Sequence, residues 1–330
     1  MTQPTTESFH VDAALTSMSV AVLQDPGNFI APNMFSNVPV AKKSDEYFVF
    51  DRSYFARSEA RKRAPGTRVA EGGFELSTQT YTCEERGVSY PIPDQVKANA
   101  DAAAPPEVAA QQWLTHQALL EQEIDFVSTF MGTGVWGTDI TGSAGTPGSG
   151  QVYQWSDYTN SDPIGDVRTG IDTILQNTGL MPNVLGISRP VFSALIDHPD
   201  IQGRINGGAT TSQPSIANRN LLAQIFEVDE VTVGQAIQNT ADEGQTADYS
   251  FIMGKDALLT YRQPSPSIMS PAAGYRFSWT GYLPGMNEFG FVIESKRRDE
   301  EDSDLYRYRS HYTNKLVASE LGYFWDSIVA

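Results

Sequence analysis

One short segment, residues 181–201, holds the residue types that nucleophilic catalysis requires. Ser188 could supply a hydroxyl, His198 a base, and Asp197 a carboxylate to orient that base. However, the side chains of adjacent Asp and His residues point in different directions, and Ser188 is better placed to cap a helix. The sequence also lacks the G-x-S-x-G turn that carries the serine of many hydrolases. We therefore interpret this segment as structural and expect no catalytic residues.

The other candidate motifs, for cofactor or metal binding, are weaker. GTGVWG at residues 132–137 matches the glycine pattern of dinucleotide-binding sites, which need a strand before the motif and a helix after it. Here we expect a helix before it and a Gly-rich loop after it. The remaining histidines are scattered, without a cysteine at ligand spacing; they are His10, His116 and His311. We expect no cofactor, no metal site and no enzymatic activity.

The composition is that of a globular protein with a strong acidic excess. Of 330 residues, 40% are hydrophobic and 19% are charged, and the formal net charge is -17. This charge argues against a large nucleic-acid-binding surface but is compatible with a container that encloses nucleic acid. Cys83 is the only cysteine, so an intrachain disulfide is excluded, which suits a reducing cytoplasm. With no signal peptide or membrane-spanning apolar run, we expect a soluble, intracellular protein.

The strongest helix signal lies after the AAAPP break at residues 102–106. The helix could run from about Pro105 to Met131. Its apolar stripe consists of Trp113, Leu120, Ile124, Val127 and Met131. Residues 132–150 are rich in Gly, Ser and Thr and are interpreted as a loop.

Three shorter helices are predicted in the central part of the chain. One follows Asp162 and ends at Gly179. The second follows a short buried strand, Val184–Ile187, and ends near Asp197. The third is expected to be capped by Ser215.

Before the long helix, two strand-like segments, Glu46–Phe55 and Phe74–Pro91, flank a polar stretch with few large apolar groups. We interpret them as a long hairpin with a flexible, basic tip. The basic residues of the tip are Arg57, Arg61, Lys62, Arg63 and Arg68. Because an isolated two-stranded hairpin is marginal in water, it needs a partner surface in its own or a neighbouring subunit.

Residues 1–45 are a poor candidate for a self-contained unit. Pro26, Pro32 and Pro39 interrupt short apolar groups, which prevents a long helix or a central strand. Because the apolar side chains still need burial, we expect an extended arm that lies on another surface.

From residue 227 onward the sequence turns to strands, so the overall pattern is mixed α+β. The expected strands are Val228–Val233, Tyr249–Met253, Leu258–Tyr261, Tyr275–Trp279, Phe289–Arg298 and Leu305–Val317. The last two form a hairpin around the acidic turn DEEDSD, residues 299–304. Its candidate contact residues are Asp299, Glu300, Glu301 and Asp302. Because their charge is opposite to that of the basic tip, we expect tip and turn to meet between copies of the chain.

The order of these elements resembles the major capsid proteins of tailed double-stranded DNA phages, which have the HK97-like fold. The resemblance covers nearly the whole chain. Three stretches carry it: MPNVLGISRPVFSALIDHPDI (181–201), FEVDEVTVGQAI (226–237) and YRYRSHYTNKLVASELGYFWDSI (306–328). They are similar to the strand and helix of the family's axial domain, the strand region after it, and the closing strands.

The resemblance implies an α+β HK97-like capsid fold with five parts. These are an N-terminal arm (1–45), an E-loop hairpin (46–95), a peripheral domain with a spine helix (96–162), an axial domain (163–254), and a peripheral-domain sheet with the C-terminal strands (255–330). The implied function is structural: self-assembly as hexamers and pentamers into an icosahedral shell around a double-stranded DNA genome. Such a protein is assembled in the host cytoplasm and resides in the virion.

The implied partners are other copies of the chain and separate scaffolding, portal and decoration proteins. DNA would be enclosed without sequence-specific binding, and no membrane is involved. Some members carry a cleaved scaffolding segment, for which the stretch before the arm is too short, so scaffolding is expected from a separate protein. Two alternatives stay open: an encapsulin-like cellular compartment shell, and a soluble oligomeric α+β enzyme or binding protein.

Overall fold

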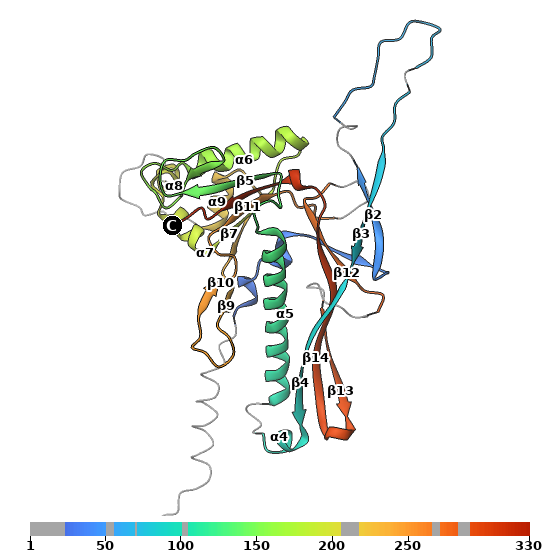
Figure 1. Ribbon diagram of the computed structural model, residues 1–330, viewed down its shortest axis with the longest axis vertical. Coiled ribbons are helices and arrows are strands. Elements are labelled where there is room, and N and C mark those ends of the chain that lie inside the picture. The colour runs from blue at the N-terminus through green and yellow to red at the C-terminus, as the bar shows by residue number, and fades with distance from the viewer. Residues whose placement is uncertain are drawn as a thin grey trace, which may run out of the picture.

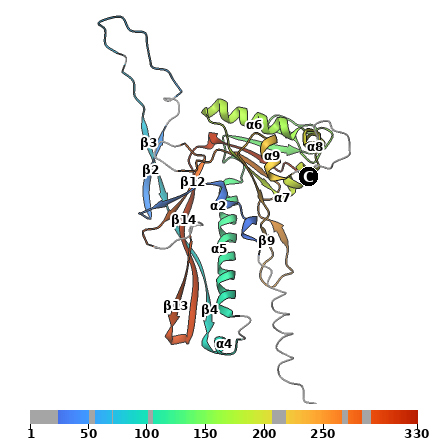
Figure 2. The same cartoon turned by 180° about the vertical axis from the view of Figure 1, so that it is seen from behind.

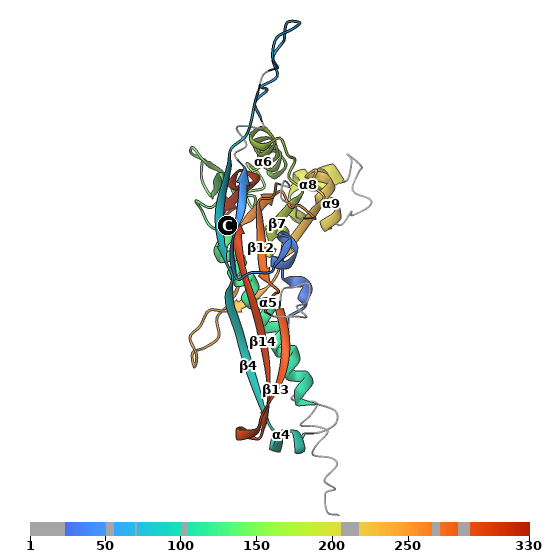
Figure 3. The same ribbon diagram turned by 90° about the vertical axis from the view of Figure 1, so that its right-hand side faces the viewer.

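The computed structural model describes residues 24–50, 56–69, 71–100, 105–205, 218–265, 271–282 and 291–330. A compact α/β part lies at one end of the long helix α5 (Pro106–Phe130), and a hairpin projects away from it (Figure 1). The view from behind shows the same arrangement (Figure 2), and the side view shows that the molecule is narrow in the third direction (Figure 3). Among the described residues, no helix is long and apolar enough to cross a membrane.

The compact part is built around a six-stranded mixed sheet with the order β6-β5-β15-β11-β7-β8. Its strands are β5 (Thr138–Ser143), β6 (Gln151–Tyr153), β7 (Val184–Ser188), β8 (Glu230–Gly234), β11 (Ala257–Thr260) and β15 (Gly322–Asp326). β7 is buried along its whole length and pairs in parallel with β8 and antiparallel with β11. The apolar run that predicted a buried strand therefore occupies an interior position of this sheet, as expected for a strand covered on both faces.

Four helices complete the compact part: α6 (Pro163–Thr178), α7 (Arg189–Asp197), α8 (Pro199–Ile205) and α9 (Arg219–Ile225). α6, α7 and α9 pack against the sheet, and α8 packs against α7. The predicted ends of α6 are confirmed, because the Asp162 side chain accepts the N–H of Gly165 and Gly179 is left-handed at φ 75°. The start of α9 differs from the prediction: Asn218 caps this helix, and Ser215 lies outside the described residues.

The second sheet lies alongside α5 and has five strands. They are β1 (Asn37–Val40), β4 (Glu84–Pro93), β12 (Gly274–Trp279), β13 (Phe291–Arg298) and β14 (Ser303–Leu316). β14 is central and pairs antiparallel with β4, β12 and β13, whereas β1 joins β12 in parallel. The predicted C-terminal hairpin is confirmed, and its acidic turn includes a short 3-10 helix, Asp299–Glu301. Further short elements are α4 (Asp94–Ala98), β9 (Ile237–Asn239), β10 (Tyr249–Phe251) and a 3-10 helix, Ser319–Leu321.

Helix α5 has nearly the predicted length but buries a different face. Its buried positions are Ala110, Leu114, Ala118, Leu119, Gln122, Glu123, Phe126 and Phe130. Within the predicted stripe, Ile124 is 39% exposed, and Trp113, Leu120 and Val127 are only partly buried. The prediction failed because two polar residues, Gln122 and Glu123, belong to the buried face, and apolar periodicity does not register them.

The first described residues, 24–40, do not form an arm that leaves the molecule. A 3-10 helix (Pro26–Asn28), α2 (Ala31–Met34) and β1 follow one another there. Four of its apolar side chains are at most 4% exposed: Phe29, Ile30, Met34 and Phe35. For this stretch the expectation of burial on another surface is wrong, because short elements between prolines fit into the chain's own core. Residues 1–23 lie outside the described part.

The projecting hairpin is confirmed, with shorter strands than predicted. β2 (Ser44–Phe50) pairs antiparallel with β3 (Leu76–Thr82), whereas residues 51–55 lie outside the described part. The second predicted strand is in fact two strands, because the chain passes from β3 into β4 of the five-stranded sheet at Cys83. Cys83 itself is fully buried.

Sheet membership cuts across the domain boundaries that the resemblance implied. β5 and β6 precede residue 163, and β11 and β15 follow residue 254, yet all four belong to the six-stranded sheet. β4 was expected in the E-loop hairpin but belongs to the five-stranded sheet. The compact part is therefore assembled from separated stretches of sequence.

Candidate functional site

The structure separates the residues of the possible triad. Ser188 precedes α7 and His198 follows it, so roughly 15 Å of helix, at about 1.5 Å per residue, lies between them. The Ser188 hydroxyl is buried and has no hydrogen-bond partner in the described part of the chain. The prediction that its side chain caps the helix is therefore wrong. Hydroxyl and imidazole cannot meet, so this segment holds no triad.

His198 has a structural role instead. Its Nδ1 accepts the backbone N–H of Asp200 at 3.2 Å, so Nε2 carries the proton and donates to the Ser161 hydroxyl at 3.0 Å. That hydroxyl in turn donates to the carbonyl oxygen of Asp157 at 2.6 Å. Burial lowers the pKa of His198, which keeps the ring neutral. The chain of hydrogen bonds joins the residues before α6 to the end of α7.

The GTGVWG motif links α5 to β5, so a helix precedes it and a strand follows it. Its Trp136 is 5% exposed, and the indole N–H donates to the carbonyl oxygen of Phe130 at 2.7 Å. The motif is therefore a packed connection without the geometry of a nucleotide site. No group of three or more His, Cys, Asp or Glu side chains in the described ranges could hold a metal ion.

The projecting hairpin carries exposed groups of two kinds. The five basic residues of its tip, Arg57, Arg61, Lys62, Arg63 and Arg68, are all exposed. Large apolar side chains are exposed as well: Phe48 is 49%, Val69 67% and Phe74 52% accessible. A two-stranded ribbon with exposed aromatic rings calls for a second surface to cover it.

The base of the hairpin, in contrast, is firmly attached. Tyr47 lies 5.5 Å from Phe277 of β12, measured between ring centroids, and Tyr81 packs on the same ring. The backbone N–H of Cys83 donates to the carbonyl oxygen of Lys43 at 2.8 Å, which closes the stem. These contacts belong to a small apolar cluster on β12, separate from the main core.

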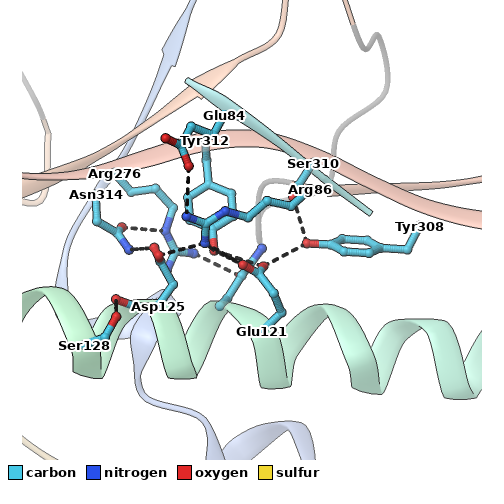
Figure 4. Close-up of polar contacts among 11 residues, drawn as sticks. Glu84, Arg86, Glu121, Asp125, Ser128, Arg276, Tyr308, Ser310, Tyr312 and Asn314 are labelled. Atoms are coloured by element: carbon cyan, nitrogen blue, oxygen red, sulfur yellow. Dashed lines mark hydrogen bonds and ion pairs between the residues drawn. The ribbon is translucent and has the colours of Figure 1, made fainter. Parts of the chain in front are cut away.

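Next to this base, a polar cluster ties β4 to α5 (Figure 4). The guanidinium group of Arg86 on β4 forms ion pairs with Glu121 and, at 2.8 Å, with Asp125. It also lies over the ring of Tyr312 on β14, 4.7 Å from the centroid, and the Tyr312 hydroxyl donates to Glu121 at 2.9 Å. Because β4 continues directly from β3, this cluster fixes the direction in which the hairpin leaves the molecule.

The acidic turn lies at the opposite end of the molecule from the basic tip (Figures 1 and 3). Tip and turn therefore do not meet within one chain. Arg298 pairs with Glu301 at 2.9 Å, and Arg297 pairs with several carboxylates around the turn. Even so, the side chains of Asp299 and Asp302 are 91% and 89% exposed, so the turn presents negative charge to solvent.

No family model matches the sequence. Two relatives, however, match it over nearly its whole length. The major capsid protein of Pseudomonas phage JBD67 is 24% identical over 330 residues, which cover 98% of each chain. The major capsid protein of Burkholderia phage BcepMu is 24% identical over 332 residues, which cover 96% of each chain.

The chain belongs to the phage major capsid proteins.

Solved structures share the fold of this capsid protein. A phage-related protein from Bordetella bronchiseptica RB50 superposes with a TM-score of 0.65 at 22% identity, covering 95% of this chain and 96% of the other. The capsid of cyanophage P-SCSP1u gives 0.58 at 11% identity, with coverages of 90% and 88%. The encapsulin complex of Synechococcus elongatus PCC 7942 gives 0.54 at 8% identity, with coverages of 95% and 94%. The fold is the HK97-like capsid fold.

The capsid protein therefore has a structural role and no enzymatic one, and its place is the capsid of the virion, which it builds with copies of itself. The resemblance seen in the sequence is confirmed. The encapsulin shares the fold, so the fold by itself does not separate the two kinds of shell; the full-length sequence relatives do.

Sequence reasoning missed the cluster that anchors the hairpin. Glu121 and Asp125 lie four residues apart on the predicted helix, so they share one face. That spacing is the signal in the sequence from which an acidic site for a basic partner could have been predicted. The partner, Arg86, comes from a segment that was interpreted as a single hairpin strand, and only the division at Cys83 brings it to the helix.

Proposed function

We propose that copies of this chain form hexamers and pentamers that close into an icosahedral shell around a double-stranded DNA genome. The observation that carries the proposal is the projecting hairpin of β2 and β3. Almost every described residue from 56 to 69 is exposed, and the stem adds the exposed ring of Phe48. In a shell, a neighbouring copy would cover these groups.

The geometry of such a contact favours closed assemblies. The hairpin leaves one side of the molecule, and a surface that receives it must lie elsewhere on the next copy, so the contact is heterologous. Repeated heterologous contacts close into rings when the rotation allows it, and many modest contacts together can hold each subunit firmly. The net charge of -17 suits a container, because DNA is then confined without adhering to the wall.

The parts of the shell protein follow from the same proposal. The hairpin serves as the E-loop, α5 and the five-stranded sheet as the peripheral domain, and the six-stranded sheet with α6 to α9 as the axial domain. Scaffolding, portal and decoration proteins are the further partners, supplied separately. A compartment shell is the second candidate, favoured by the shared encapsulin fold alone.

We further propose that the basic tip meets the acidic turn of another copy. The candidate contacts are Arg57, Arg61, Lys62, Arg63 and Arg68 on one copy and Asp299, Glu300, Glu301 and Asp302 on the other. Opposite charge supports this pairing, as does the position of tip and turn at opposite ends of one molecule. Together these features make the contact possible between copies and not within one.

The experiment that tests the shell proposal removes the projecting part and keeps the stem. Phe50 and Leu76 are the last paired residues, so an Asn-Gly turn can replace residues 51–75 between them. We expect a folded protein that no longer forms shells, as judged by size-exclusion chromatography and negative-stain electron microscopy. The matched control shortens another hairpin in the same way, with Asn-Gly in place of residues 240–248 between Asn239 and Tyr249. Shells formed by the variant without residues 51–75 would contradict the proposal.

A further inference from the structure

Glu123 is an acidic residue in an apolar part of the molecule. Its side chain is 1% exposed. Its Oε2 accepts two backbone N–H groups, from Ile30 at 2.9 Å and from Ala31 at 2.8 Å. Its Oε1 is buried and has no hydrogen-bond partner among the described residues. Burial of a carboxylate with hydrogen bonds to only one of its two oxygens costs free energy. Its position here therefore needs an explanation.

The two N–H groups belong to the segment that we call the arm root, residues 29–35. They lie at the start of α2, where the first N–H groups of a helix have no partner within the helix. The arm root inserts its apolar side chains into the core: Met34 is fully buried and its sulfur accepts the hydroxyl of Thr232 at 3.1 Å. Glu123 is thus the polar link between α5 and the arm root.

Other charged groups do not neutralise this carboxylate directly. Arg276 of β12 is also buried, and its positive charge favours the ionised form of Glu123. The two side chains nevertheless form no ion pair in the described structure. The Arg276 guanidinium instead donates to Gln122 at 3.0 Å and to Asn314 at 3.3 Å. The carboxylates of Glu121 and Asp125 also act electrostatically on Arg276. Residues 29–35 include no titratable side chain, so the arm root itself brings no charge near Glu123.

We propose that Glu123 is a pH-sensitive link that fastens the arm root to α5 when protonated and loosens it when ionised. In the neutral state the carbonyl oxygen still accepts both N–H groups, and no charge is buried. In the ionised state, separation of the arm root from α5 lets water reach the carboxylate, which offsets part of the lost packing. The link therefore sets how firmly the arm root is held on α5.

The titration range supports this role. Burial raises the pKa of Glu123 to about 7, against the two backbone hydrogen bonds and the field of Arg276, which lower it. The state with the arm root bound to α5 then holds the proton more tightly than the released state, so the attachment weakens as the pH rises toward 7. With an ordinary glutamate pKa once the arm root has left α5, linkage gives a fall of about tenfold in the ratio of bound to released arm root between pH 6 and pH 8.

The test measures backbone hydrogen exchange, corrected for the intrinsic effect of pH on exchange, at pH 6 and pH 8. In the wild-type chain we expect the peptide covering residues 24–36 to lose about tenfold in protection between pH 6 and pH 8. Glu123→Gln keeps the shape and the acceptor for both N–H groups but cannot ionise, so its protection should not change with pH. Glu107→Gln removes a half-exposed charge from the same helix and should behave as wild type.

Three outcomes decide the matter. Equal pH dependence in wild type and Glu123→Gln would overturn the proposal, and so would equal protection of residues 24–36 at both pH values in the wild type. A loss of protection in residues 24–36 that Glu123→Gln abolishes would support it. If Glu123→Gln did not fold, the wild-type comparison of residues 24–36 at the two pH values would still decide. Shell formation is not part of the readout, so this result is independent of the proposed assembly.

Discussion

Tyr81 stacks on Phe277 with ring centroids 4.7 Å apart and ring planes 13° apart. The contact joins β3 of the projecting hairpin to β12 of the five-stranded sheet. The hairpin is therefore held by apolar contacts at its base, while its tip is exposed and available to another copy. This division between a fixed base and a free tip is the structural basis of the predictions on assembly.

Phe277→Leu should loosen the hairpin and leave the rest of the chain folded. Leucine keeps an apolar side chain but removes the ring contacts with Tyr47 and Tyr81, at a cost of about 1–2 kcal/mol in the free energy of unfolding. Urea unfolding measures the cost, and hydrogen exchange should increase in residues 44–50 and 76–82. Phe251→Leu, at a ring that is 39% exposed, is the control and should change neither. Unaltered exchange in the stem would show that stacking does not hold it.

Reversing the charge of the tip should block assembly without unfolding the chain. The variant carries Arg61→Glu, Lys62→Glu and Arg63→Glu. We expect an unchanged melting temperature and a loss of shells in negative-stain images. Wild-type assembly should weaken at high salt, because screening shortens the reach of exposed charges to about 3 Å at 1 M.

The matched control reverses three exposed basic residues on the compact part, Arg189, Arg219 and Lys255, for the same change in net charge. It should still assemble. A compensating variant, with Asp299→Lys, Glu300→Lys and Glu301→Lys added to the reversed tip, should recover shells. If shells form with the reversed tip alone, the tip and the turn do not pair.

Gly322→Ala should destabilise the compact part. A Cβ atom at residue 322 would lie 2.0 Å from the ring of Trp136, which is 5% exposed and cannot move aside freely. We expect a loss of about 1–3 kcal/mol in the free energy of unfolding, as for other overpacked cores. Gly145→Ala is the control, because a Cβ there meets no atom within 4 Å. Equal urea midpoints for the two variants would contradict the close packing of β15 against Trp136.

Asp166→Asn should change how stability depends on pH. Burial raises the pKa of Asp166 to about 6, although the indole N–H of Trp155 donates to it at 2.9 Å and opposes the shift. The folded state therefore binds the proton more tightly than the unfolded state. The wild-type chain loses stability as the pH rises from 4 to 7, and the variant should gain about 1–3 kcal/mol over it across that range.

The measurement is urea unfolding at several pH values for both chains. Asp172→Asn, at an exposed position on the same helix, is the control for the change in charge. A constant difference in stability between wild type and Asp166→Asn from pH 4 to pH 7 would show that this carboxyl group is not perturbed.

Several local elements could be read from the sequence because local chemistry determines them. Asp162 and Gly179 mark the two ends of α6, since a side-chain cap and a left-handed glycine act within a few residues. The apolar run Val184–Ile187 and the proline at 199 bounded β7 and α7 correctly. The exposed basic tip was also evident, because its stretch holds too few apolar groups to be buried.

Other features depended on contacts between distant residues, which only the tertiary structure decides. Phe29 and Met34 are buried in their own chain because α5 and the six-stranded sheet offer a site for them, not because of any local pattern. The same holds for Glu123, because the two backbone N–H groups that donate to its side chain belong to residues 93 and 92 positions away in the sequence. The sequence by itself determined where α6, β7 and α7 begin and end and which tip stays polar. The tertiary structure decided which faces are buried, because burial is a property of the neighbours that packing brings together.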